Sequence, residues 1–296
     1  MALSTPEKSL IWWATNCSGG LCDRLLGLVS TYCIAKELGR EFLIRWDDTD
    51  VSHIMPVQEK YNYYTYNLSF FNHLPNNHAA QDFYADKDQI KLWEDKAHVL
   101  TWSNQNLFYL FCQNRPEINY RDRLTEGFQK LQDFFHFPLL NLQVKPVGIH
   151  IRTLDKLIRD PSQAESQREV IEKIFQKLQP CIEAKEEIFL SSDCELAYEI
   201  GKTYFPNLSY QPGRVIHTAE SQDKEGWLKV LGHLFSLSLC DKLYIGWHTN
   251  FARVACLLNP KREFYCYEYG ENQTVKQCDF MELSSYFSKP FWRMAR

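Results

Sequence analysis

The sequence lacks long apolar runs and has no block of charge of one sign. No window of about 18 apolar residues occurs anywhere, and residues 1–8 lack the apolar stretch of a signal peptide, so we expect neither a secretory signal nor a membrane-spanning helix. The formal net charge is -4 and the cationic residues are scattered, which argues against a nucleic-acid partner. We therefore expect a soluble, cytoplasmic protein.

The ten cysteines include no CxxC pair and no other zinc-type spacing, so a sulfur-bound metal is not expected. In the compartment predicted above, thiols stay reduced. We accordingly expect the cysteines to be reduced. The four Asn-x-Ser/Thr triplets are interpreted as chance matches, because no targeting signal accompanies them.

The first fifty residues contain an α/β unit. Residues 10–14 are an apolar run, residues 16–20 form a turn, and apolar side chains recur at helical spacing over 21–38 until Gly39. Residues 41–46 are again strand-like. A strand, turn, helix and strand in this order predict the start of a parallel α/β sheet.

Residues 51–140 are rich in Tyr, Phe, Asn and His, and their periodicity is weaker. Aromatic rings stack on the CH faces of sugars and amides bond sugar hydroxyls, but the same side chains also build ordinary cores. The composition leaves both interpretations open.

Strands and helices alternate regularly after the Lys145-Pro146 joint. The pattern predicts strands at 147–151, 188–191, 214–217 and 243–247, and helices at 168–178, 227–239 and 250–258. This alternation predicts a doubly wound sheet. We divide the chain into an N-terminal α/β domain (1–143), a Rossmann-like domain (144–280) and a C-terminal segment (281–296).

A charged segment follows the predicted strand at 147–151 and contains Arg152, Asp155 and Lys156. The carboxyl ends of the strands border the ligand crevice of such a sheet. An arginine there can hold a diphosphate through two hydrogen bonds, or it can form an ordinary ion pair with Asp155. Periodicity alone does not choose between these two interpretations.

Four segments, taken in order, resemble one enzyme family. Residues 148–156 are similar to its His-x-Arg-x-x-Asp motif, residues 189–193 to a strand that ends in Thr/Ser-Asp, and residues 237–255 to its helix, strand and Ser-Ser-x-x-x-Arg-x-Ala segment. Residues 19–25 resemble its glycine-rich turn. The family is the fucosyltransferase-like superfamily of GT-B glycosyltransferases, which includes core α1,6-, Nod-factor and protein O-fucosyltransferases.

The resemblance implies two Rossmann-like domains that face each other across a cleft. It implies an inverting glycosyltransferase that moves a sugar from a nucleotide-sugar donor to a hydroxyl of an oligosaccharide or a glycoprotein glycan. The donor is then a co-substrate, and neither a cofactor nor a metal is required. Residues 1–143 would carry the acceptor side, and residues 281–296 would pack back on that domain.

The resemblance also assigns roles to single residues. Arg152 matches the arginine that contacts the donor diphosphate, and Thr249 matches a serine that reaches the phosphates. Asp160 lies where the core enzymes place a catalytic carboxylate, and there it would take the proton of the acceptor hydroxyl. The other residues predicted to line the donor site are His150, Asp155, Lys156, Asp193, His217, Thr218, His233, His248, Gly19, Gly20 and Arg24.

Two positions depart from the family pattern and leave the donor open. Thr153 stands where the core enzymes carry a second arginine, and His233 stands where they carry an aspartate that binds guanine. A neutral imidazole cannot accept both N–H groups of the guanine edge. The donor is therefore GDP-fucose or a UDP-sugar such as UDP-xylose. A catalytically silent nucleotide- or sugar-binding module on the same fold is the alternative.

An Asp-x-Asp pair, Asp48 and Asp50, also has the form of a metal-diphosphate site in another glycosyltransferase fold. Because the rest of the chain resembles the metal-independent class, we interpret it as an exposed acidic loop or an acceptor contact.

Overall fold

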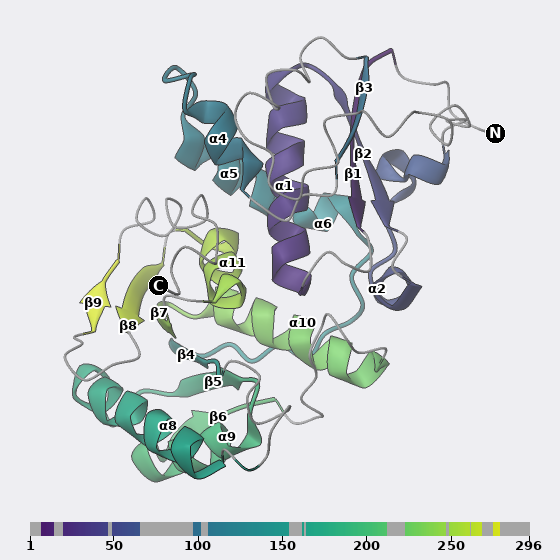
Figure 1. Ribbon diagram of the computed structural model, residues 1–296. Coiled ribbons are helices and arrows are strands. Elements are labelled where there is room, and N and C mark those ends of the chain that lie inside the picture. The colour runs from purple at the N-terminus through teal and green to yellow at the C-terminus, as the bar shows by residue number, and fades with distance from the viewer. Residues whose placement is uncertain are drawn as a thin grey trace. The chain divides into compact units, whose positions relative to one another are not determined.

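The computed structural model describes residues 7–14, 20–46, 49–65, 97–101, 106–153, 162, 164–211, 223–246, 249–260, 262–267 and 275–278. These residues form two compact units, divided between Pro138 and Leu139. Each unit is built on a sheet of mainly parallel strands flanked by helices, which confirms the predicted α/β class (Figure 1). The predicted C-terminal segment 281–296 lies outside the described residues.

The N-terminal unit holds a three-stranded sheet in the order β2-β1-β3. Its strands are β1 (Ser9–Ala14), β2 (Glu41–Trp46) and β3 (His98–Thr101), and both neighbours of β1 run parallel to it. Helix α1 (Leu21–Glu37) connects β1 to β2 and ends before Gly39, whose φ of 62° is left-handed. The prediction of this strand, helix and strand is confirmed.

Aromatic residues of the region 51–140 build core in this unit. The ring of Phe134 lies 5.0 Å from that of Tyr32, 5.5 Å from that of Phe42 and 4.9 Å from that of Tyr61. For these rings the core interpretation holds. The remaining helices are α2 (Thr49–Ile54), η1 (Glu59–Tyr61), η2 (Tyr63–Thr65), α4 (Leu107–Cys112), α5 (Tyr120–Gln129) and α6 (Leu131–Phe134).

The C-terminal unit holds a six-stranded sheet in the order β6-β5-β4-β7-β8-β9. The strands are β4 (Val147–Ile151), β5 (Ile188–Ser192), β6 (Leu208–Ser209), β7 (Lys242–Gly246), β8 (Glu263–Tyr267) and β9 (Lys276–Gln277). All neighbours run parallel except β9, which is antiparallel to β8. The chain starts at β4, moves outward to β6 and then continues on the other side of β4, which is the predicted doubly wound order.

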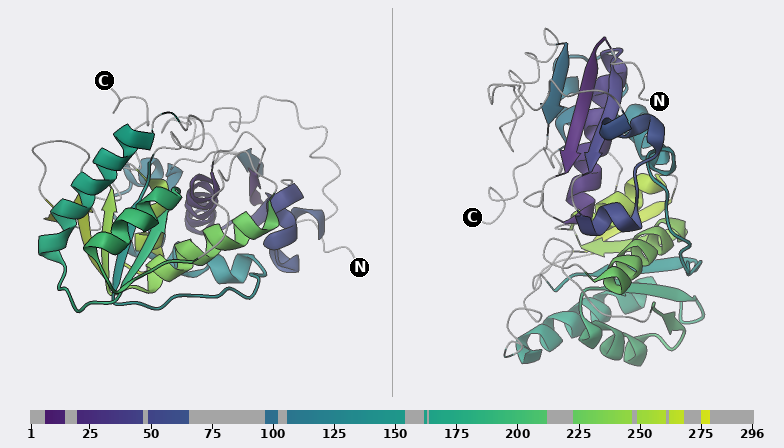
Figure 2. Two further views of the ribbon diagram at one scale, coloured as in Figure 1. Left: turned by 90° about the horizontal axis from the view of Figure 1, so that it is seen from below. Right: turned by 90° about the vertical axis from the view of Figure 1, so that its right-hand side faces the viewer.

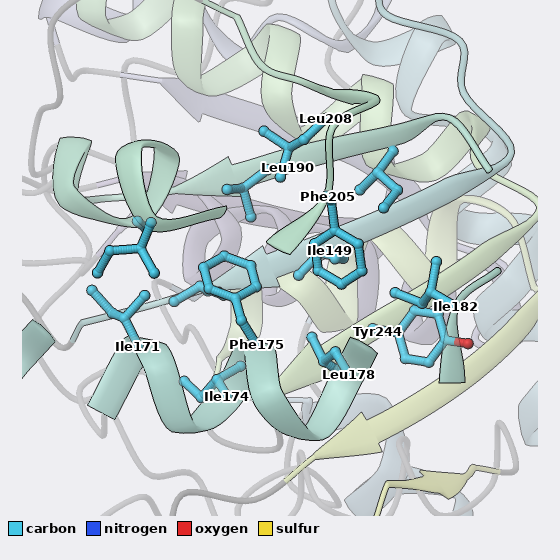
Figure 3. Close-up of a cluster of buried hydrophobic side chains, with 14 of the residues drawn as sticks. Ile149, Ile171, Ile174, Phe175, Leu178, Ile182, Leu190, Phe205, Leu208 and Tyr244 are labelled. Carbon is cyan, nitrogen blue, oxygen red and sulfur yellow. The ribbon is translucent and has the colours of Figure 1, made fainter. Parts of the chain in front are cut away.

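Helices cover both faces of this sheet (Figure 2). The helices are α8 (Ala164–Leu178), η7 (Gln179–Cys181), α9 (Glu195–Tyr204), α10 (Lys224–Leu239) and α11 (Asn250–Leu258). Side chains of α8 such as Phe175 pack with Ile149 and Leu190 in one buried cluster (Figure 3). On the opposite face, α10 approaches β4 closely at Gly148, where an added Cβ would lie 3.1 Å from Cδ2 of Leu237.

Most predicted elements of this unit match the structure, and the helix predicted over 168–178 starts earlier, at Ala164. Strands β6, β8 and β9 and helix α9 were not predicted, and the predicted strand 214–217 lies outside the described residues. Within the described part of the chain, no helix has the length and apolar composition needed to cross a bilayer.

One expectation about the cysteines is wrong. A disulfide joins Cys266 of β8 to Cys278, whose Cα atoms lie 6.2 Å apart. The antiparallel pairing of β9 with β8 brings the two residues together, and the spacing of the cysteines in the sequence did not predict that pairing. Six other cysteines of the described residues are free thiols: Cys33, Cys112, Cys181, Cys194, Cys240 and Cys256.

Candidate functional site

The strand order of the C-terminal sheet reverses between β4 and β7. The last register pair of these two strands is His150 with Ile245, whereas β4 stays paired to β5 as far as Ile151 with Ser192. The carboxyl ends of β4 and β7 therefore separate at the place where doubly wound sheets bind ligands. Arg152 follows β4 at this point, and Thr249 lies on the chain that leaves β7.

His150 is buried behind the separation point. Its Nδ1 lies 3.4 Å from Oγ1 of Thr249, and its ring stacks on that of Phe251 with centroids 5.2 Å apart. Burial, together with the positive charge of Arg152, lowers the pKa of His150 to about 3. The imidazole is therefore neutral at physiological pH and acts as a spacer between β4 and α11 rather than as a cation.

Thr249 is the N-cap of α11. Its Oγ1 accepts a hydrogen bond of 3.1 Å from the backbone N–H of Ala252, which satisfies one free donor of the first turn. The remaining N–H groups of that turn and the helix dipole make this end of α11 favourable for an anion. The structure thus brings a helix N-terminus and an arginine to neighbouring strand ends.

Asp193 connects the ends of β4 and β5. Its Oδ1 accepts from the backbone N–H of Thr153 at 2.8 Å and from the hydroxyl of Thr153 at 3.1 Å. Thr153, the position that departs from the family pattern, is thus a structural partner of Asp193. The backbone bond does not depend on the side chain at position 153, whereas the hydroxyl bond does.

His233 lies in the contact between α10 and the sheet. Its Nδ1 lies 3.1 Å from Oγ of Ser191, and its Nε2 lies 3.4 Å from the backbone oxygen of Gln211. Burial and the neighbouring Lys229 lower its pKa to about 3. Both ring nitrogens are thus within hydrogen-bond distance of protein atoms, and a donor contact of His233 stays a prediction.

Gly20 and Arg24 belong to the N-terminal unit. Gly20 is the N-cap of α1, and its N–H donates to Oδ2 of Asp23 at 3.1 Å. The side chain of Arg24 is buried within this unit. Their predicted contacts with a donor stay predictions.

Several predicted site residues lie outside the described residues, and their roles stay predictions: Asp160, Asp155, Lys156, His217, Thr218, His248 and Gly19. Asp48 is also outside them. Among the residues that the structure describes, no group of three or more His, Cys, Asp or Glu side chains is arranged to hold a metal ion.

One residue at the separation point was not predicted from the sequence. Tyr267, the last residue of β8, donates its hydroxyl hydrogen to the backbone oxygen of His150. Strand β8 was not predicted, so Tyr267 had no assigned place. The short aromatic and apolar run from Phe264 to Tyr267, between two glutamates, was the available signal.

The sequence matches no protein-family model and no curated protein. Solved structures with a similar fold include fucosyltransferases. A mutant of Arabidopsis thaliana FUT1 in complex with GDP superposes with a TM-score of 0.55 at 15% identity, covering 91% of this chain and 73% of that one. The fucosyltransferase NodZ from Bradyrhizobium gives 0.51 at 15% identity, covering 93% and 99%. NodZ α-1,6-fucosyltransferase co-crystallized with GDP gives 0.52 at 17% identity, covering 92% and 99%. The chain therefore shares its α/β fold with these fucosyltransferases.

Proposed function

We propose that the chain is a glycosyltransferase that uses a nucleotide-sugar donor and binds the donor diphosphate at the carboxyl ends of β4 and β7. One observation carries the proposal: Arg152 follows β4 and the N-terminus of α11 follows β7, at the point where the strand order reverses. Fucosyltransferases of the same fold have been crystallised with GDP, which supports this class of ligand.

The charge distribution of the site supports an anionic ligand. His150 is neutral and Thr249 is uncharged, so the positive charge at these strand ends comes from Arg152 and from the dipole of α11. A guanidinium binds two phosphate oxygens at once and stabilises the negative charge that develops as the nucleoside diphosphate leaves. We therefore assign diphosphate binding to Arg152 and to the first turn of α11.

In the proposed reaction, a hydroxyl of a glycan acceptor attacks the anomeric carbon from the face opposite the diphosphate. The bond between that carbon and the phosphate oxygen breaks, and the hydroxyl proton passes to Asp160, so the configuration inverts. No metal takes part in this scheme. An activity that survives a chelator such as EDTA is the expected result, and a loss of activity would instead support a metal site at Asp48 and Asp50.

The base of the donor is not read by a carboxylate on α10. His233 occupies that helix position and its ring nitrogens face Ser191 and Gln211. We propose GDP-fucose and a UDP-sugar such as UDP-xylose as the two donors to be compared. The acceptor is proposed to be an oligosaccharide or a glycoprotein glycan.

A thermal-shift comparison of GDP, UDP, GDP-fucose and UDP-xylose tests the donor. A ligand at 100 times its Kd stabilises the folded state by about 2.7 kcal/mol, which gives a visible shift. Arg152→Ala should abolish the shift. Arg168→Ala is the matched control, because Arg168 is an exposed arginine of α8 in the same unit. A shift that survives in Arg152→Ala would overturn the assignment.

A transfer assay separates an enzyme from a silent module. Asp160→Asn should still bind nucleotide and should lose turnover. If the wild-type chain binds nucleotide but transfers no sugar from any of the donors to a panel of glycans, the chain is a binding module on this fold.

A further inference from the structure

The end of β4 has an unusual position in its sheet. β7 stays paired to β8 up to Gly246 with Tyr267, but it pairs with β4 only up to Ile245. Near its end, β4 therefore no longer forms regular backbone hydrogen bonds with β7. This part of β4 is still buried, since His150 is only 4% exposed. Buried backbone carbonyls need a hydrogen-bond donor from elsewhere.

Tyr267 supplies such a donor from two strands away. β8 is separated from β4 by β7, yet the hydroxyl of Tyr267 reaches the backbone oxygen of His150. The ring is 1% exposed and belongs to the same buried cluster as Ile149 and Ile151. Packing therefore restricts the ring, and the hydroxyl has a definite direction.

His150 is held on its other side by α11. Its ring stacks on Phe251, and its Nδ1 faces the Oγ1 of the N-cap Thr249. One residue thus connects the last strand of the parallel set, the helix N-terminus and the strand end that carries Arg152. A shift of the His150 backbone would move Arg152 relative to the first turn of α11.

We propose that Tyr267 is a positioning residue for anion binding: its hydroxyl holds the end of β4 so that Arg152 and the first turn of α11 meet the same diphosphate. This inference rests on the proposed donor site. Tyr267 acts through the backbone of His150 and is not itself assigned a contact with the donor.

Tyr267→Phe tests the inference, because it removes one oxygen and keeps the ring. The matched control is Tyr244→Phe. Tyr244 lies on β7 in the same buried cluster and donates its hydroxyl hydrogen to the backbone oxygen of Cys181 at 2.9 Å. Cys181 precedes β5, so this bond lies at the amino end of the strands, away from the candidate site.

The readout is the Kd of GDP or UDP, whichever binds the wild-type chain, by titration calorimetry, with urea unfolding alongside. We expect Tyr267→Phe to weaken binding roughly five- to tenfold, the factor that corresponds to one hydrogen bond of about 1 to 1.4 kcal/mol. Tyr244→Phe should change the Kd by less than about twofold, while both variants lower the urea midpoint by similar amounts. Equal Kd values for the two variants would overturn the inference.

A double-mutant cycle tests the route through Arg152. In an Arg152→Lys background, Tyr267→Phe should change the Kd by less than about twofold. The guanidinium that binds two phosphate oxygens, and that Tyr267 is proposed to position, is already absent there. An undiminished effect contradicts the route. If neither nucleotide binds the wild-type chain, the proposed donor site itself fails, which is a different result from equal binding by both tyrosine variants.

If Tyr267→Phe does not fold, hydrogen exchange of the wild-type chain provides the test. Saturating nucleotide should then slow exchange of the Tyr267 amide together with that of Arg152. Protection of Arg152 without Tyr267 would overturn the inference.

Discussion

The two sheets are built alike and end differently. In the N-terminal unit the carboxyl ends of β1 and β2 carry large side chains, with the guanidinium of Arg45 4.4 Å from the ring centroid of Trp13. In the C-terminal unit the chain segments that follow β4 and β5 are joined by a hydrogen bond between polar residues, Thr153 and Asp193. Parallel sheets offer ligands the same edge, so the chemistry of that edge decides which ligand fits.

The helix N-termini differ in the same way. In α1 the carboxylate of Asp23 accepts from the N–H of Gly20, so a negative group already occupies the positive end of the helix. In α11 the cap is the neutral hydroxyl of Thr249. Of these two ends, the one in the C-terminal unit suits an added anion, which is why we place the diphosphate there.

The largest expected difference between the units is that acid lowers the stability of the C-terminal unit. The pKa values of His150 and His233 are both lowered to about 3, so the folded unit keeps them neutral while the unfolded chain protonates them below about 6.5. Their stabilising contribution is complete above that value and is lost as the pH falls. We expect the free energy of unfolding to fall by up to about 1.4 kcal/mol per pH unit for each histidine.

Urea unfolding at pH 7, 6 and 5 measures this slope. His233→Gln should remove about half of it, since one of the two protonations disappears. A slope that His233→Gln leaves unchanged would show that other groups cause the acid sensitivity.

The next largest expected difference is that a reductant lowers the stability of the C-terminal unit, which contains the disulfide. The bond between Cys266 and Cys278 closes a loop with a sequence separation of 12 in the C-terminal unit. A disulfide that closes a loop of this size contributes roughly 3 kcal/mol to the free energy of unfolding. Cys278→Ser should therefore destabilise this unit by about that amount. Cys181→Ser, which changes an exposed free thiol, serves as the control.

Counting thiols by alkylation and mass spectrometry checks the premise. Protein that is purified and denatured without reductant should show two fewer reactive thiols than protein that is reduced and denatured. An equal count would remove this difference between the units.

Glycine contacts give a smaller effect that should be similar in both units. An added Cβ would lie 2.5 Å from Cδ2 of Leu243 at Gly148 and 2.7 Å from Sγ of Cys33 at Gly127. Each Gly→Ala change should cost roughly 1–3 kcal/mol by overpacking. Calorimetry of the two variants tests whether the units unfold separately. In each variant, only the unfolding transition of the unit that carries the substitution should move to lower temperature. A joint shift would show that the units are energetically coupled.

The helix caps give the smallest effect and the sharpest contrast. Thr249→Ala and Asp23→Ala should each cost about 1 kcal/mol of stability. Only Thr249→Ala should also raise the Kd for nucleotide, because only α11 is proposed to bind the diphosphate. Equal losses of nucleotide affinity in the two variants would contradict that assignment.

Prediction from sequence succeeded where the pattern is local. The strand over 147–151 is buried on both faces and its sequence is apolar except for His150, and the helix over 250–258 has strong amphipathic spacing. The predicted bounds of both elements agree with the structure. Strand β6 is two residues long, and β3 lies in an aromatic segment of weak periodicity, so neither left a local pattern to recognise.

The candidate site was predictable in part. Arg152 and Thr249 were singled out from the segments around them, and the structure places both at neighbouring strand ends. The pairing of Thr153 with Asp193 was not predictable, because the partners lie 40 residues apart in the chain. The same holds for Tyr267, whose partner His150 is 117 residues away.

The order of strands and helices, the parallel α/β class and the charged segment after β4 follow from the sequence itself, because each depends on the spacing of neighbouring side chains. The tertiary structure decided which strand ends lie together, that His150 and His233 are neutral, and that Cys266 meets Cys278. Those outcomes depend on burial and on hydrogen bonds between strands distant in the chain, and no local pattern encodes them.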